Sequence, residues 1–244
     1  TDFNPFESIP GVSLRYVKHL SELGNPDVIM LPGTKNTMED LQWLRESGME
    51  ALILKAAAKG TFVFGICGGY QMLGESLSDP YGVEAGGTMR GMGLLPMETV
   101  FAKKKTRTQV QGKYLDIQGE YEPLSGVEFT GYEIHMGEST WKSGAKASTW
   151  TKDSVSGKEK TEGTVYGNVC GTYVHGIFDR EESALALIRA VGEKKGIDVS
   201  NMEGVDFAAF KETQYDILAA ELRKHFDIKK IYQILEEGIG GSKK

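Results

Sequence analysis

The sequence has only two cysteines, Cys67 and Cys170, among 244 residues. Two cysteines cannot build the multi-disulfide framework that stabilises small secreted domains. No apolar run approaches the ~20 residues that cross a bilayer, and no signal peptide is visible. These absences predict a cytoplasmic protein in a reducing compartment, with no membrane as partner.

Basic residues are also too few to suggest a nucleic-acid partner, because 28 lysines and arginines stand against 34 acidic residues. The cluster Lys103-Lys104-Lys105 is short and typical of a solvated loop. No G-x-x-x-x-G-K-[ST] stretch is present, so no ATP site of that kind is expected in this chain. The cysteines and four histidines show no zinc-site spacing, and we expect no metal.

What is present is a short apolar run, TFVFGI at residues 61–66, that ends at Cys67. Its β-branched and aromatic residues predict a buried strand, and a helical pattern follows as far as Leu77. Strand, sharp turn and helix with a reactive residue at the turn is the arrangement called a nucleophile elbow. Gly65 and Gly68-Gly69 suit it, because the turn strains the backbone and leaves no room for side chains.

Spacing alone leaves Cys67 open between a catalytic nucleophile and an ordinary core cysteine, since free cysteines are usually buried. A second segment, Val174-His175-Gly176, also follows an apolar run, and Gly33 follows a third. The carboxyl ends of parallel strands meet at one edge of a sheet. Gly33, Cys67 and His175 are therefore predicted to lie at the same edge.

The order of elements predicts an α/β fold, in which a mostly parallel sheet has helices on both faces. Residues 94–150 have short β-type runs that suggest an antiparallel extension. Residues 12–23 are ambiguous between a short helix and a strand plus helix. Amphipathic helices are expected at 181–195, 207–226 and 228–235. We expect one domain over 1–236 and a disordered tail over 237–244.

Several separated motifs in order resemble the class I glutamine amidotransferases, which have a flavodoxin-like fold. They are GICGGYQMLG at residues 65–74 and VHGIFD at 174–179. Three further segments, LPGTKNT at 31–37, GMGLLP at 91–96 and GYEIHMG at 131–137, are similar to the cobyric acid synthase and cobyrinate diamide synthase branch. TDFNPF at 1–6 favours the cobyric acid synthases.

The resemblance implies glutamine hydrolysis through a cysteine thioester. Cys67 is then the nucleophile, and His175 is the base and acid that moves the proton. The backbone N–H of Gly68 is one oxyanion donor, and the Gly33-Thr34 turn supplies the second. Gln71 is a candidate for binding the substrate.

One position departs from the family pattern, since many class I amidotransferases carry glutamate where this chain has Ile177. Asp179 and Glu181 follow, but their reach to His175 does not follow from the sequence. We expect a Cys–His dyad, with an orienting group from elsewhere still open. Glu133 and His135 share one face of a strand, and both packing and a place beside the glutamine pocket or an ammonia channel remain open.

The resemblance also implies parts outside this chain: a preceding synthetase domain that uses ATP and magnesium, a corrin substrate bound there, and a first β-strand just before Thr1. The expected function is the glutaminase half of a cobyric acid synthase, which amidates adenosylcobyrinic acid a,c-diamide. Alternatives are the glutaminase of cobyrinate a,c-diamide synthesis or of an enzyme that amidates a cell-wall lipid precursor. A cysteine hydrolase or a noncatalytic binding or scaffold domain would belong to another class.

Overall fold

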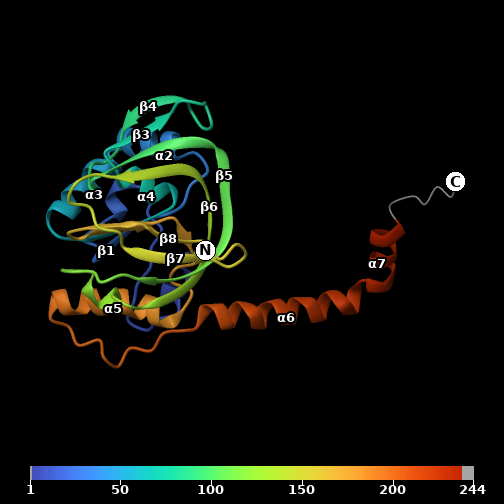
Figure 1. Cartoon of the computed structure of the whole chain (residues 1–244). Coiled ribbons are helices and arrows are strands. Elements are labelled where there is room, and N and C mark those ends of the chain that lie inside the picture. Colours follow the sequence, from blue (N-terminus) through green and yellow to red (C-terminus); the bar gives the residue numbers. More distant parts are fainter. Residues whose placement is uncertain (1, 238–244) are drawn as a thin grey trace. The chain divides into compact units, whose positions relative to one another are not determined.

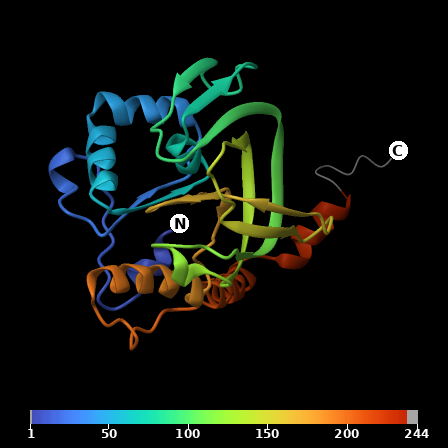
Figure 2. The same ribbon diagram turned by 60° about the vertical axis from the view of Figure 1, so that its left-hand side comes forward.

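The structure of the chain is a computed structural model that describes residues 2–237, apart from the side chain of Ala208. Contacts divide the chain into two units, Thr1–Val205 and Asp206–Lys244. The first unit holds two β-sheets with helices packed on them (Figures 1 and 2). The domain boundary at residue 236 stays a prediction. Of the expected tail, Glu237 ends a helix and the rest lies outside the described residues.

The smaller sheet has four strands in the order β1-β2-β10-β9, and the predicted parallel core is confirmed in it. β2 pairs in parallel with both β1 and β10, whereas β9 is antiparallel to β10. Every residue of β2 is buried, which fits an apolar strand covered on both faces. The strands are β1 (Val28–Leu31), β2 (Phe62–Ile66), β9 (Thr164–Tyr166) and β10 (Val169–Thr172).

Alternate residues of β2 enter two apolar clusters. Phe62, Phe64 and Ile66 belong to one cluster, and Val63 belongs to the other. The first cluster includes buried residues of helix α5, and the second includes residues of α2 and α3. The sheet is therefore packed on both faces, as the sequence predicted for an α/β fold.

Capping residues explain where α2 begins and where α5 ends. The Asn36 side chain accepts the Glu39 N–H at 3.3 Å and caps α2. Gly196 has a φ of +65° and ends α5. The helices of the first unit are α1 (Asn4–Glu7), α2 (Thr37–Glu46), α3 (Met49–Ala58), α4 (Gly68–Leu73) and α5 (Glu181–Lys195), with 3-10 turns at Leu20–Glu22 and Glu122–Leu124.

The larger sheet realises the predicted antiparallel extension. Its main order is β11-β6-β5-β3-β4, with β7 paired to β5 and β8 paired to β7. Figure 2 shows the long β5 and β6 curving beside the smaller sheet. The strands are β3 (Ser76–Asp79), β4 (Gly87–Arg90), β5 (Met97–Tyr114), β6 (Glu128–Trp141), β7 (Thr149–Asp153), β8 (Glu159–Glu162) and β11 (Val174–His175).

One transition between the sheets places a functional residue. The chain leaves the parallel sheet at the end of β10, passes Tyr173 and pairs with β6 as β11. His175 pairs with Tyr132 in this short antiparallel ladder. The imidazole is therefore fixed where the two sheets meet, beside the carboxyl ends of the parallel strands.

Two local predictions were wrong or incomplete. Residues 12–23 contain no α-helix: residues 12–18 are irregular and a 3-10 turn follows at Leu20–Glu22. The helix after Cys67 ends at Leu73, and Leu77 is a buried residue of β3. Gly74 follows that helix with an extended backbone. The apolar pattern therefore continues to Leu77 although the helix has ended.

Among its described residues, the second unit has the helices α6 (Phe207–His225) and α7 (Ile228–Glu237), which confirms the helices predicted there. The Asp206 side chain caps α6 by accepting the Ala209 N–H at 2.9 Å. Among residues 2–237, the structure has no helix with the length and hydropathy to cross a membrane.

Candidate active site

Cys67 lies at a strained turn between β2 and α4. Its backbone has φ +51° and ψ −108°, and no other non-glycine residue between 2 and 237 has a positive φ. The neighbouring glycines let the turn close, since a β-carbon at Gly65 would lie 2.7 Å from the backbone of Tyr70. A β-carbon at Gly69 would lie 2.2 Å from the Leu31 carbonyl oxygen. Strain held by such packing is typical of functional positions, and the geometry is that of a nucleophile elbow.

His175 comes to Cys67 from β11, close enough for Cys67 to raise the pKa of the imidazole. The Cys67 thiol itself donates to the Ile134 carbonyl oxygen of β6 at 3.7 Å. The ring of Tyr132 stacks on the imidazole at 5.0 Å between centroids. The Gly33 turn approaches both side chains, since a β-carbon there would lie 2.6 Å from His175 Cε1 and 3.5 Å from Cys67 Cβ. The three residues predicted to share one sheet edge are therefore together, and only glycine fits at position 33.

The orienting group that the sequence left open beside the Cys–His dyad is a carboxylate, since His175 contacts Asp2. Asp2 Oδ2 lies 3.0 Å from His175 Nδ1, and Asp2 Oδ1 accepts the Gly176 N–H at 2.8 Å. Asp2 thus occupies the Nδ1 side of the imidazole, while the Glu181 carboxylate accepts the Gly204 N–H at 2.9 Å. Asp2 was not predicted from the sequence, because 173 residues separate it from His175.

These contacts set the protonation of the pair. Burial lowers the pKa of His175, but hydrogen bonds to Asp2 and Cys67 and their negative charges raise it, to about 9. Burial raises the pKa of the Asp2 carboxyl, but the hydrogen bonds from His175 and Gly176 outweigh it, and the pKa lies below its ordinary value. Asp2 is therefore a carboxylate beside a protonated imidazole at neutral pH.

Backbone donors for an oxyanion lie on two sides of Cys67. The Gly68 N–H is at the first residue of α4, where no carbonyl of a preceding turn can accept it. Thr34 lies against Gly68, since a β-carbon on Gly68 would be 3.0 Å from the Thr34 nitrogen. The Thr34 hydroxyl oxygen is buried and has no hydrogen-bond partner in residues 2–237. The predicted oxyanion donors are thus adjacent, and their role stays a prediction.

Gln71 lies one turn into α4 and is held by polar side chains. Its Oε1 accepts the Thr37 hydroxyl at 3.0 Å, and its Nε2 donates to the Tyr173 hydroxyl at 3.3 Å. Thr37 also contacts Glu84 Oε1 at 3.2 Å, and Glu84 Oε2 accepts the Met38 N–H at 3.2 Å. Burial raises the pKa of Glu84. Gln71 was predicted from the sequence, whereas its contacts with Thr37 and Tyr173, and the contact of Thr37 with Glu84, were not.

Glu133 and His135 contact each other on β6, as their spacing predicted, with 3.2 Å between Glu133 Oε2 and His135 Nε2. Lys160 Nζ donates to the same Glu133 oxygen at 2.5 Å. Glu133 Oε1 is buried without a partner in the described part of the chain. Burial raises the pKa of the Glu133 carboxyl. The hydrogen bonds and charges of His135 and Lys160 lower it by more, so the pKa lies below its ordinary value.

Tyr173 connects this pair to Gln71. Its ring stacks on His135 at 3.9 Å, while its hydroxyl contacts Gln71 and Ser139. No hydrogen bond in the described structure joins Glu133 or His135 to Cys67 or His175. Glu133 and His135 are therefore linked to Gln71 through Tyr173. Within residues 2–237, no three His, Cys, Asp or Glu side chains are grouped to hold a metal ion.

Comparisons with known proteins agree with this geometry. The chain is 51% identical over 247 residues to a cobyric acid synthase of Lachnoclostridium phytofermentans, which covers 98% of this chain and 48% of that protein. It is 50% identical to the cobyric acid synthase of Ruminiclostridium cellulolyticum, over 98% of this chain and 47% of that protein. The chain thus spans about half the length of the curated relatives it matches.

A likeness at the level of the fold is found with the structure of PurLQS from Thermotoga maritima. The TM-score is 0.57 at 18% identity, over 79% of this chain and 90% of that chain. Residues 1–183 match the family model of the CobB/CobQ-like glutamine amidotransferase domain. With the elbow at Cys67 and His175 beside it, this match shows that the chain belongs to the CobB/CobQ-like glutamine amidotransferase family.

Proposed function

We propose that this chain is the glutaminase part of a cobyric acid synthase. The observation that supports this most is the strained Cys67 at the end of β2, with His175 beside it and the Gly33 turn against both side chains. Relatives that carry the name cobyric acid synthase match 97–98% of the chain. The reaction converts glutamine and water to glutamate and ammonia.

In the first half-reaction the Cys67 sulfur attacks the side-chain amide carbon of glutamine. The new C–S bond places negative charge on the amide oxygen, where the N–H of Gly68 and of the Gly33-Thr34 turn can donate. His175 then gives its proton to the departing nitrogen, the C–N bond breaks, and ammonia leaves. The remaining group is a γ-glutamyl thioester on Cys67.

In the second half-reaction a water molecule attacks the thioester. His175, now neutral, takes a proton from the water and keeps it as the C–S bond breaks, so the imidazole again holds the proton that the next turnover needs. The same donors stabilise the second oxyanion. Glutamate leaves, and the thiol and imidazole return to their starting state.

Glu84 is proposed to bind the α-ammonium group of glutamine, since its carboxylate contacts Thr37, which packs against Gly68. Replacing Glu84 by glutamine keeps the shape but removes the charge. We expect the KM for glutamine to rise about 10-fold or more, the range for a hydrogen bond to a charged group. Steady-state glutaminase kinetics measure this.

The matched control for this prediction is Glu39→Gln, which removes an exposed carboxylate from the first turn of α2. Its KM should equal that of the wild type. An unchanged KM for Glu84→Gln would place the α-ammonium site elsewhere.

The ammonia is proposed to pass to a synthetase part of the longer protein, which would use ATP and magnesium to activate carboxylates of adenosylcobyrinic acid a,c-diamide. The test is an amidation assay on the full-length protein with glutamine, ATP and Mg²⁺, read by mass spectrometry. The acceptors compared are this diamide, cobyrinic acid and a cell-wall lipid precursor. Amidation of the diamide alone is expected. Amidation of either other acceptor would assign the chain to that pathway.

A further inference from the structure

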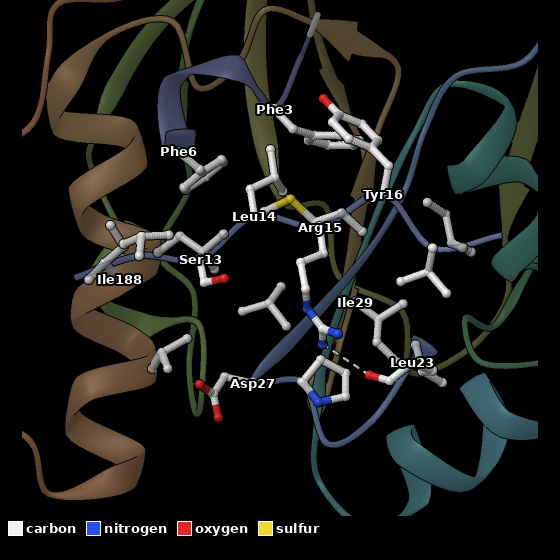
Figure 3. Close-up of a pocket in the computed structure, with 18 of the residues that line it drawn as sticks. Phe3, Phe6, Ser13, Leu14, Arg15, Tyr16, Leu23, Asp27, Ile29 and Ile188 are labelled. Carbon is white, nitrogen blue, oxygen red and sulfur yellow. Dashed lines mark hydrogen bonds between the residues drawn. The ribbon is translucent and has the colours of Figure 1, made fainter. Parts of the chain in front are cut away.

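The large groove beside β1 does not contain the site around Cys67. It has a volume of about 1080 Å³, with Ile188 of α5 on one side and Leu23 and Ile29 on the other (Figure 3). Its described lining is mostly apolar and includes neither Cys67 nor Gln71. Polar side chains lie instead around Gln71, one helical turn after Cys67, and these are the groups that can recognise a polar amino acid.

A series of hydrogen bonds starts at Gln71 and ends at Thr99. Gln71 Nε2 donates to the Tyr173 hydroxyl at 3.3 Å, and this hydroxyl lies 2.7 Å from that of Ser139. The Ser139 and Thr99 hydroxyls lie 2.8 Å apart. Gln71, Tyr173 and Thr99 are buried, and Ser139 is half-buried. The proposed reaction moves no proton through these hydroxyls, so their arrangement calls for another role.

The direction of these hydrogen bonds follows from the protons available. Burial raises the pKa of the Tyr173 hydroxyl, so Tyr173 stays a neutral phenol with one O–H proton. Because the phenol oxygen accepts the Gln71 amide, its own proton goes to the Ser139 hydroxyl oxygen. Tyr173 therefore acts as an acceptor toward Gln71, and an acceptor there can bind only the NH₂ end of the carboxamide.

The opposite end of the Gln71 carboxamide has a less selective partner. Its Oε1 accepts the Thr37 hydroxyl at 3.0 Å, but a hydroxyl can either donate or accept. Thr37 alone would therefore also tolerate the carboxamide turned over, since both ends have nearly the same shape. A β-carbon at Gly137 would lie 2.2 Å from Nε2, so the carboxamide fits closely where it is. The Tyr173 hydroxyl thus decides which end faces which way.

The Tyr173 side chain is itself held in one place. Its ring stacks on His135 at 3.9 Å and meets the Tyr70 ring edge-on at 5.2 Å between centroids. Its backbone N–H donates to Glu162 Oε2 at 2.9 Å. Because the ring is packed on two sides and the backbone is fixed, the hydroxyl keeps one position against Gln71.

We propose that Tyr173 is a positioning residue for the binding of glutamine, because its hydroxyl fixes the orientation of the Gln71 carboxamide. The inference rests on the proposed glutaminase function, with Gln71 as a residue that binds the substrate. Gln71 shares the Thr37 hydroxyl with Glu84, the proposed partner of the α-ammonium group. A carboxamide with one orientation offers every bound glutamine the same donor and acceptor, whereas one that turns over offers the wrong group part of the time.

The first test compares two tyrosine variants of the full-length protein in steady-state glutaminase kinetics. Tyr173→Phe removes only the hydroxyl. We expect the KM for glutamine to rise about 3–10-fold, the range for one neutral hydrogen bond, while kcat stays within about 2-fold of the wild type. The control Tyr70→Phe removes a buried hydroxyl that contacts Thr164 and Trp141 instead, and it should keep the wild-type KM.

The split between KM and kcat separates substrate binding from an effect on His175, which follows Tyr173 by two residues. If Tyr173 only shaped β11, Tyr173→Phe would lower kcat and leave KM unchanged, and this result would overturn the proposal. A wild-type KM with a wild-type kcat would overturn it too. So would an equal rise of KM in Tyr70→Phe.

A double-mutant cycle tests whether Tyr173 acts through Gln71. Gln71→Leu removes the carboxamide at similar volume and should raise KM at least as much as Tyr173→Phe does. In the Gln71→Leu background, Tyr173→Phe should raise KM no further. Additive increases would overturn the proposal, because Tyr173 would then affect glutamine by a route that does not include Gln71.

Glutamine binding can also be measured without the reaction, by calorimetric titration of the full-length Cys67→Ala variant. Adding Tyr173→Phe should raise the Kd for glutamine by the same factor as KM. An unchanged Kd, in a protein whose wild type hydrolyses glutamine, would refute the role of Tyr173 and leave the proposed function standing. A wild type that does not hydrolyse glutamine would refute the proposed function itself.

Discussion

Cys67→Ala is expected to abolish glutamine-dependent amidation by the full-length protein while ammonia-dependent amidation continues. The variant removes the only atom proposed to form a bond with glutamine, so no slower route through the same site remains. In the proposed function the synthetase part would take ammonia directly, so it would not need the elbow. The measurement is product formation with glutamine or with ammonium salt as nitrogen donor, for wild type and variant side by side.

The control thiol for this experiment is Cys170. It is fully buried in β10, and burial raises the pKa of its thiol, so it is a core residue. Cys170→Ala should keep both activities at the wild-type ratio, with a cost in stability alone. Normal use of glutamine by Cys67→Ala would disprove the central assignment.

His175→Ala is expected to lower glutaminase kcat by about 10²–10⁴-fold or more, the range for one proton-transfer group. The loss includes both the acid that protonates ammonia and the base that activates water. Asp179→Ala is the comparison, and it should cost little, because Asp2 already occupies Nδ1 of the imidazole. A loss with Asp179→Ala as large as with His175→Ala would make Asp179 the orienting carboxylate.

The glutaminase activity of the wild type is expected to fall at alkaline pH. The pKa of His175 is raised from an ordinary value of ~6.5 to about 9, so the protonated imidazole persists through neutral pH. Activity should fall as pH rises through about 9, because the proton for the leaving ammonia is lost. The same contacts stabilise the fold fully below about pH 6.5, and this contribution disappears as pH rises through about 9.

The residues at strand ends could be predicted from the sequence. Cys67, His175 and Gly33 each follow an apolar run, and the geometry of parallel sheets brings such positions together. The elbow also has a local signature, since Gly65, Gly68 and Gly69 surround the strained cysteine. Glu133 and His135 were placed on one face of a strand by period two, and they contact each other.

Asp2 and Glu84 could not be predicted in the same way, because they reach the site through tertiary folding. Asp2 precedes a one-turn helix, and nothing around it shows which group it contacts. Glu84 follows β3, and its contact with Thr37 depends on how the two sheets meet.

The most direct test of the account is covalent labelling of the protein by a glutamine-analogue electrophile, followed by peptide mapping. If Cys67 is the nucleophile, we expect rapid modification of Cys67 alone. Glutamine should protect Cys67 from the label, and labelling should be much slower in His175→Ala. Cys170 should stay unmodified, because it is completely buried. An unmodified Cys67, or labelling that glutamine does not slow, would contradict the assignment of Cys67 as the nucleophile that attacks glutamine.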